Sequence, residues 1–175
     1  MIKLLDSLNK NYYIEFEEVL PNHIFKEKYY ELITGKWIYF GNSNESSPYY
    51  FWNQNLIDDS FYNDELLKKI EKLCQQEFKL TRVFANGQTF GQPGILHQDS
   101  KDDDTYTFII YMNPYWNIHW GGNTVFYKNE NNYMSYTPKP NFGLIFKSNL
   151  LHVGLDPSRD CKELRITVAY TLQIK

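Results

Sequence analysis

Short, alternating or wholly apolar segments make up the second half of the chain, and this pattern limits the fold more than any other feature. They begin at Leu80 and recur at nearly regular spacing to the C-terminus. The segments are Leu80–Ala85, Thr105–Met112, Gly121–Lys128, Tyr133–Thr137, Phe142–Lys147, Leu150–Gly154 and Leu164–Leu172. Aromatic residues, which favour strands, form 18% of the chain. Several short strands at such spacing predict a β-sandwich or jelly roll.

Two segments before Leu80 have the apolar spacing of helices. Asn22–Thr34 begins with a possible N-cap at Asn22 and is followed by Gly35 as a stop. Asp64–Phe78 carries a clear apolar stripe. We therefore expect a mainly β fold with flanking α-helices that pack outside the strands.

The loops carry two further predictions. Asn86-Gly87 is a strong turn signal and should end the strand Leu80–Ala85. The polar segment Gly41–Pro48 is either a solvated connection or a loop that covers a substrate.

Charge and cysteine content restrict the partners and the compartment. The net charge is -3, which argues against a nucleic-acid partner bound by bulk charge. Cys74 and Cys161 form no metal motif; ordinary thiols in a reducing compartment are favoured, and a disulfide stays open. We find neither a signal-peptide pattern nor an apolar run near the ~20 residues of a membrane span. A soluble cytoplasmic protein that binds no membrane is expected.

His97 and Asp99 stand two residues apart in Gly94–Ser100, so on an extended segment their side chains point the same way. His152 supplies a third ligand further along the chain. Alone, a His-x-Asp pair is often a turn aspartate beside a surface histidine. Two imidazoles and a carboxylate, however, form the facial triad that leaves positions open on a non-haem Fe(II) ion.

An arginine lies thirteen residues after His152. In Leu164–Tyr170 the even-numbered positions are apolar, while Arg165, Thr167 and Ala169 occupy the other face of the predicted strand. A lone strand arginine is most often a surface ion-pair residue. Beside three metal-ligand candidates, its planar fork is better suited to holding a carboxylate.

From about Leu80 onward, the chain resembles the Fe(II)- and 2-oxoglutarate-dependent dioxygenases, specifically the prolyl-4-hydroxylase-like branch. The matching segments are Phe84–Gln88, His97–Asp99, Tyr111–Asn113 followed by Trp116, Gly121–Phe126, His152 and Arg165–Thr167. The resemblance implies a double-stranded β-helix, or jelly roll, with N-terminal helices packed on one sheet. It also implies one domain over residues 1–175, with 1–79 as helical support and 80–175 as the metal-binding core.

The same resemblance implies the roles of the site residues. Fe(II) would bind His97, Asp99 and His152, and 2-oxoglutarate would bind through its far carboxylate to Arg165 and Thr167. Oxygen would be the second co-substrate, and succinate and carbon dioxide would be released as a substrate is hydroxylated.

Two positions depart from the family pattern. Phe84 stands where relatives often carry a tyrosine that helps to hold the co-substrate. A second such tyrosine aligns with Ile110, which predicts that the adjacent Tyr111 faces the opposite side.

Substrate contacts are expected from the loop before Gly121. Tyr115, Trp116 and Trp120 lie there and would form an apolar wall around a peptide or ring, or else pack the loop onto the sheet. His119 is a separate candidate for contact with the substrate. The favoured substrate is a prolyl or other peptidyl residue. A free amino acid or small metabolite is the alternative, and a non-catalytic jelly-roll module is a third. A zinc hydrolase is disfavoured because the chain has no His-Glu-x-x-His helix.

Overall fold

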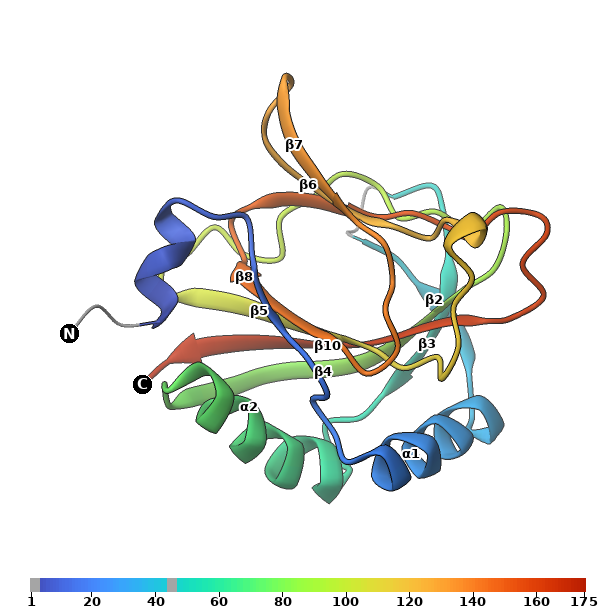
Figure 1. Cartoon of the computed structure of the whole chain (residues 1–175), viewed down its shortest axis with the longest axis horizontal. Coiled ribbons are helices and arrows are strands. Elements are labelled where there is room, and N and C mark those ends of the chain that lie inside the picture. Colours follow the sequence, from blue (N-terminus) through green and yellow to red (C-terminus); the bar gives the residue numbers. More distant parts are fainter. Residues whose placement is uncertain (1–3, 44–46) are drawn as a thin grey trace.

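The computed structural model describes residues 4–43 and 47–175 and contains two antiparallel sheets that face each other (Figure 1). The larger sheet has the strand order β1-β8-β5-β10-β4-β3-β2, and the smaller has the order β7-β6-β9. The strands of the larger sheet are β1 (Ile14–Phe16), β2 (Ile38–Gly41), β3 (Phe51–Asn55), β4 (Phe78–Gln88), β5 (Thr105–Tyr111), β8 (Gly143–Lys147) and β10 (Arg165–Ile174). Those of the smaller sheet are β6 (Thr124–Asn129), β7 (Asn132–Tyr136) and β9 (Leu151–Gly154).

Both long helices cover the outer face of the larger sheet (Figure 1), as the sequence predicts. They are α1 (Asn22–Thr34) and α2 (Leu67–Cys74), the latter preceded by a π-helical turn at Phe61–Leu66; short 3-10 turns lie at Leu4–Asn9 and Ile118–Trp120. The core beneath them contains Phe25, Leu32, Leu66 and Ile70 from the helices and Val83, Phe108, Ile110 and Val168 from the sheet. Burial of this face leaves the opposite face of the sheet to build a site.

The helix ends differ in part from the prediction. The first helix has the predicted bounds, and the Gly35 N–H bonds to the Leu32 carbonyl at its end. Its cap residue is Pro21, with no side-chain cap bond, so Asn22 is not the N-cap. The second helix ends at Cys74 because Gln75 adopts a left-handed conformation, and Phe78 begins β4 instead of ending the helix.

The predicted turn at Asn86-Gly87 is wrong, because β4 continues through both residues. Gly87 pairs with Ile166 of β10 and Trp52 of β3. A Cβ on Gly87 would lie 2.9 Å from the Trp37 ring, so this glycine permits close packing. Residues 1–79, expected to be helical support, also supply β1, β2 and β3 to the larger sheet.

Three other features bear on the predictions. Cys74 and Cys161 are both free thiols, so the disulfide alternative is wrong. Across residues 4–43 and 47–175, no helix has the length and apolar character needed to cross a bilayer. Part of the predicted loop Gly41–Pro48, residues 44–46, lies outside the described residues.

Candidate active site

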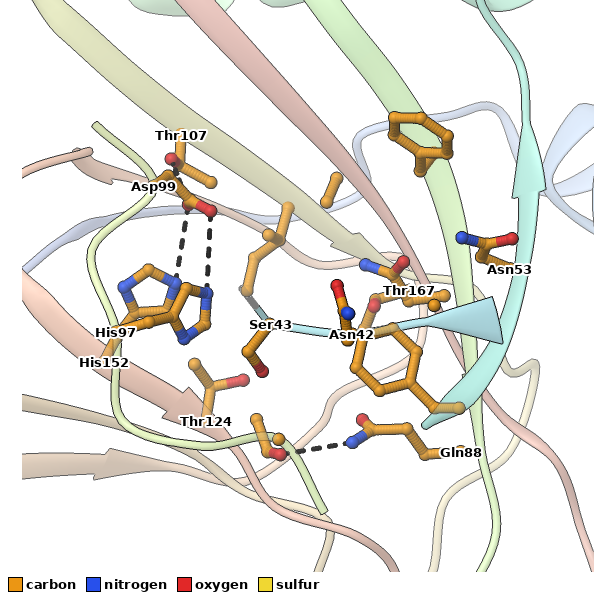
Figure 2. Close-up of a pocket in the computed structure, with 18 of the residues that line it drawn as sticks. Asn42, Ser43, Asn53, Gln88, His97, Asp99, Thr107, Thr124, His152 and Thr167 are labelled. Carbon is orange, nitrogen blue, oxygen red and sulfur yellow. Dashed lines mark hydrogen bonds and ion pairs between the residues drawn. The ribbon is translucent and has the colours of Figure 1, made fainter. Parts of the chain in front are cut away.

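A cavity of about 290 Å³ lies between the two sheets, and residues of β2 and β3 form part of its lining. The larger sheet forms its floor through side chains of β3, β4, β5 and β10, and His152 of β9 lies across from them (Figure 2). Every candidate metal ligand and co-substrate residue that the sequence predicts lines this one cavity: His97, Asp99, His152, Arg165 and Thr167.

Backbone pairing brings the two histidines together from distant parts of the chain. The His97 N–H bonds to the His152 carbonyl at 3.0 Å, and the His152 N–H bonds to the His97 carbonyl at 2.9 Å. Each ring places Nδ1 on the carbonyl two residues earlier, that of Ile95 at 2.8 Å and that of Leu150 at 2.9 Å. Because a carbonyl only accepts, Nδ1 carries the proton in the neutral ring and Nε2 keeps a free lone pair.

Both free Nε2 atoms point at the Asp99 carboxylate (Figure 2). The Nε2 of His97 lies 3.6 Å from one carboxylate oxygen, and the Nε2 of His152 lies 3.5 Å from the other. One ligand atom from each of the three residues falls within 4.8 Å of the others. Two imidazoles and one carboxylate suit Fe(II) and leave positions open on one side.

Two hydrogen bonds hold Asp99 in this orientation. The Thr107 hydroxyl donates to Oδ2 at 2.6 Å, and Arg82 Nη2 donates to Oδ1 at 2.8 Å. Burial alone would raise the pKa of the carboxyl. The neighbouring His97, His152, Thr107 and Arg82 outweigh burial and hold this pKa well below its usual range. Asp99 is therefore ionised and ready to bind a cation.

The two imidazoles differ in protonation. Burial lowers the pKa of the His97 ring, but contact with Asp99 more than offsets this, so the pKa lies above its usual value. His152 is more deeply buried, and its pKa lies below the usual value despite the Asp99 charge. His152 thus stays neutral at pH values where His97 gains a proton.

Arg165 lies buried elsewhere in the same cavity lining. It donates from Nε to the Gly122 carbonyl at 2.6 Å, from Nη1 to Gln88 at 2.8 Å and from Nη2 to Thr124 at 3.2 Å. The guanidinium also lies over the Tyr111 ring. Among the residues that the structure describes, it forms no ion pair with an acid. A buried charge of this kind needs a counter-charge, which a bound carboxylate would supply.

Solved structures resemble the whole fold. A prolyl hydroxylase from Trichoplax adhaerens, in complex with a hypoxia inducible factor oxygen degradation domain peptide fragment, is 18% identical with a TM-score of 0.74, covering 98% of this chain and 88% of that one. A Pseudomonas putida prolyl-4-hydroxylase is 16% identical with a TM-score of 0.69, covering 98% and 97%. The alpha ketoglutarate dependent epimerase SnoN from nogalamycin biosynthesis is 10% identical with a TM-score of 0.66, covering 98% and 81%. The predicted double-stranded β-helix is confirmed.

Among curated proteins, no sequence matches the chain. The sequence profile of the 2OG-Fe(II) oxygenase superfamily, however, matches residues 80–171, which is more than half of the chain. The chain belongs to this superfamily. A 2OG-Fe(II) oxygenase is an oxidoreductase that uses Fe(II) and 2-oxoglutarate, so the alternative of a non-catalytic module is wrong.

The oxygenase floor is arranged in cross-strand rows. Asn53 of β3, Asn86 of β4, Thr167 of β10 and Tyr111 of β5 are register partners across four neighbouring strands. Ile110 packs in the helix-covered core, so Tyr111 faces the site, and the prediction that it faces away is wrong. The error follows from strand alternation, because a shift of one residue reverses the face.

The aromatic loop of this oxygenase lies outside the cavity lining. Tyr115 and Trp120 pack edge to face, as do Trp116 and Trp120, and Trp116 Nε1 donates to the Gly121 carbonyl. His119 is exposed on the same loop. None of Tyr115, His119 and Trp120 lines the cavity that holds the metal-ligand candidates, and their contact with a substrate stays a prediction.

Three residues of the cavity lining, Arg82, Asn86 and Gln88, were given no site role from the sequence, whereas Phe84 was aligned with a co-substrate position. Arg82, Phe84, Asn86 and Gln88 alternate along β4 and all line the cavity. Their spacing of two was a usable signal. The turn expected at Asn86-Gly87 obscured it, since a turn would have divided these residues between two elements.

Proposed function

We propose that this oxygenase binds Fe(II) through His97, Asp99 and His152 and 2-oxoglutarate through Arg165, with a contribution from Thr167. One observation carries the proposal. The three ligand atoms converge in the same cavity that holds a buried guanidinium without an acidic partner among the described residues. The donor set suits the metal, and the buried guanidinium suits the far carboxylate of a dicarboxylic acid.

The residues of the chain orient and protect these groups. Nδ1 bonds to the backbone fix both rings with Nε2 toward the Asp99 carboxylate, where these three residues would hold the metal, while Thr107 holds the carboxylate. Phe84, Ile109 and Phe146 give the lining an apolar portion that limits water. When bound, Fe(II) and 2-oxoglutarate would supply, together with O₂, oxidation of a C–H bond to C–OH, with succinate and carbon dioxide as the other products.

We propose hydroxylation of a prolyl or other peptidyl residue as the first candidate reaction. The likeness to two prolyl hydroxylase structures supports it. Hydroxylation of a free amino acid or small metabolite is the second candidate. Arg82, a second guanidinium in the cavity lining, favours it because a free amino acid carries a carboxylate that a mid-chain prolyl residue lacks.

The test is oxygen transfer from labelled O₂ to a defined substrate. The enzyme is incubated with Fe(II), 2-oxoglutarate and either a library of proline-containing peptides or a set of free amino acids. Mass spectrometry should find one labelled oxygen in a product, with succinate formed in equal amount. Succinate formation that depends on neither Fe(II) nor 2-oxoglutarate would contradict the proposal.

A further inference from the structure

Arg82 presents a fixed guanidinium to the cavity beside the metal-ligand candidates. It lies on β4 opposite Thr171 of β10, and its Nε donates to the Thr171 hydroxyl at 2.8 Å. Its Nη2 donates to Asp99 at 2.8 Å. The Nε and Nη2 atoms of the guanidinium are therefore already hydrogen-bonded. The Nη1 group has no hydrogen-bond partner within residues 4–43 and 47–175, and the side chain is 49% exposed.

Among the lining residues that the structure describes, the charges do not cancel. Arg82, Arg165 and Asp99 are the ionised side chains of this set, giving two positive charges and one negative charge. Fe(II) and the 2-oxoglutarate dianion have equal and opposite charges, so their binding would leave this net charge of one unchanged. The 2-oxoglutarate carboxylate would neutralise Arg165. The Nη1 group of Arg82, called its free edge below, would remain available to bind another anion.

Uncharged hydrogen-bonding groups line another part of the same cavity. The side chains of Asn42, Asn53 and Asn86 line the cavity, and none of them has a hydrogen-bond partner among the described residues. Asn42 and Asn53 lie toward the β2 and β3 side of the cavity, across from the histidines (Figure 2). Amides without partners can donate to and accept from a polar ligand.

Resting on the proposed function, we infer that the substrate carries a carboxylate that binds the free edge of Arg82. The inference names the chemistry shared by a free amino acid and by a C-terminal or acidic residue of a peptide. Arg82 would then select the substrate by charge, with the asparagine amides completing its polar contacts.

Matched ligand pairs test this by binding instead of turnover. Isothermal titration under nitrogen uses the enzyme loaded with Mn(II) and 2-oxoglutarate. The ligands are free amino acids, N-acetyl amino acids and short acidic peptides, each paired with the carboxamide that replaces its carboxylate. The affinity ratio of acid to amide is compared among wild type, Arg82→Gln and Arg82→Lys. Taking the ratio within one variant removes any loss transmitted through Asp99 to the metal.

The wild type should bind at least one acid about tenfold or more tightly than its amide. Arg82→Gln should bring the ratio near one, and Arg82→Lys should retain part of it. Arg159→Gln, which removes an exposed arginine outside the cavity lining, is the matched control and should leave the ratio unchanged. Comparison of free amino acids with N-acetyl amino acids and acidic peptides distinguishes a free amino acid from a peptide as the source of the carboxylate.

No preference for any acid in the wild type, including no binding by any pair, would overturn the inference. A ratio that survives in Arg82→Gln would also overturn it. If the wild type bound neither Mn(II) nor 2-oxoglutarate, the proposed function would be wrong. Failure of the proposed function is therefore distinguishable from failure of the inference about Arg82.

Discussion

The His97 and His152 rings are oriented by their own backbone. Each Nδ1 bonds to the carbonyl two residues earlier, and this local geometry selects the tautomer with Nε2 available. Asp99 completes the set from the same segment as His97. At the residue scale, the site thus depends on short-range hydrogen bonds and one long-range backbone pairing, His97 with His152.

Metal affinity should depend on pH through His97. A protonated ring cannot coordinate, and His97 has the raised pKa, whereas His152 has a lowered pKa and stays neutral. As pH falls from 8 to 6, Mn(II) affinity should decrease with the stoichiometry of one proton, approaching about tenfold per pH unit. Titration calorimetry in the metal-free enzyme checks this. His119→Ala, at an exposed histidine outside the cavity, should keep the same profile, and a flat wild-type profile would contradict the assignment.

Arg165→Ala should weaken 2-oxoglutarate binding while leaving Mn(II) binding nearly intact. Loss of charge-assisted bonds should cost about 2–4 kcal/mol, or roughly 30- to 1000-fold in affinity. Arg165→Lys should restore part of it, since an ammonium lacks the planar fork. Thr167→Val should cost about 1 kcal/mol.

Calorimetry of 2-oxoglutarate binding to the Mn(II)-loaded variants measures these effects. Arg165 also bonds to Gly122, Gln88 and Thr124, so circular dichroism must show that each variant is folded. Unchanged 2-oxoglutarate affinity in folded Arg165→Ala would remove this residue from the co-substrate site.

At the scale of elements, the alternation of apolar and polar residues predicted the strand faces correctly, whereas the local turn signal did not predict a turn. The face that Arg165 and Thr167 share on β10 followed from the apolar residues between them, and the cavity lining confirms it. Asn86-Gly87 has turn chemistry, yet β3 and β10 pair with it on both sides and keep it extended. Such tertiary pairing cannot be read from a dipeptide. The strand β3 was missed for a related reason, because its pairing with β4 defines it more than its own composition does.

The helices that cover the larger sheet should stabilise the fold without contacting the residues of the site. Ile70 of α2 is fully buried against the larger sheet. Ile70→Ala should lower the free energy of unfolding by about 2–5 kcal/mol through lost burial and the cavity left behind. The exposed neighbour Lys72 is the control, and Lys72→Ala should change the free energy of unfolding by about 0.5 kcal/mol or less. Urea unfolding measures both, and equal effects would contradict the packing account.

At the scale of the whole molecule, the two sheets supply different residues of the site. The larger sheet buries one face under α1 and α2 and offers the other to the cavity, while β9 of the smaller sheet carries His152 across from it (Figure 1). The sequence motifs predicted which residues meet, because His97, Asp99, His152 and Arg165 are chemically distinctive. Arg82 and Thr107 could not be assigned to Asp99 from sequence, since their contacts arise only when β4, β5 and β10 lie side by side.

The most direct test of the central claim is anaerobic titration of the protein with Fe(II) and 2-oxoglutarate, followed by visible absorption. The wild type should develop a weak charge-transfer band only when both are present, because the metal and the keto acid would then meet at one site. His152→Ala should lose the band, and His119→Ala should keep it. Absence of the band from folded wild-type protein at saturating Fe(II) and 2-oxoglutarate would contradict the assignment of this cavity as an Fe(II)- and 2-oxoglutarate-binding site.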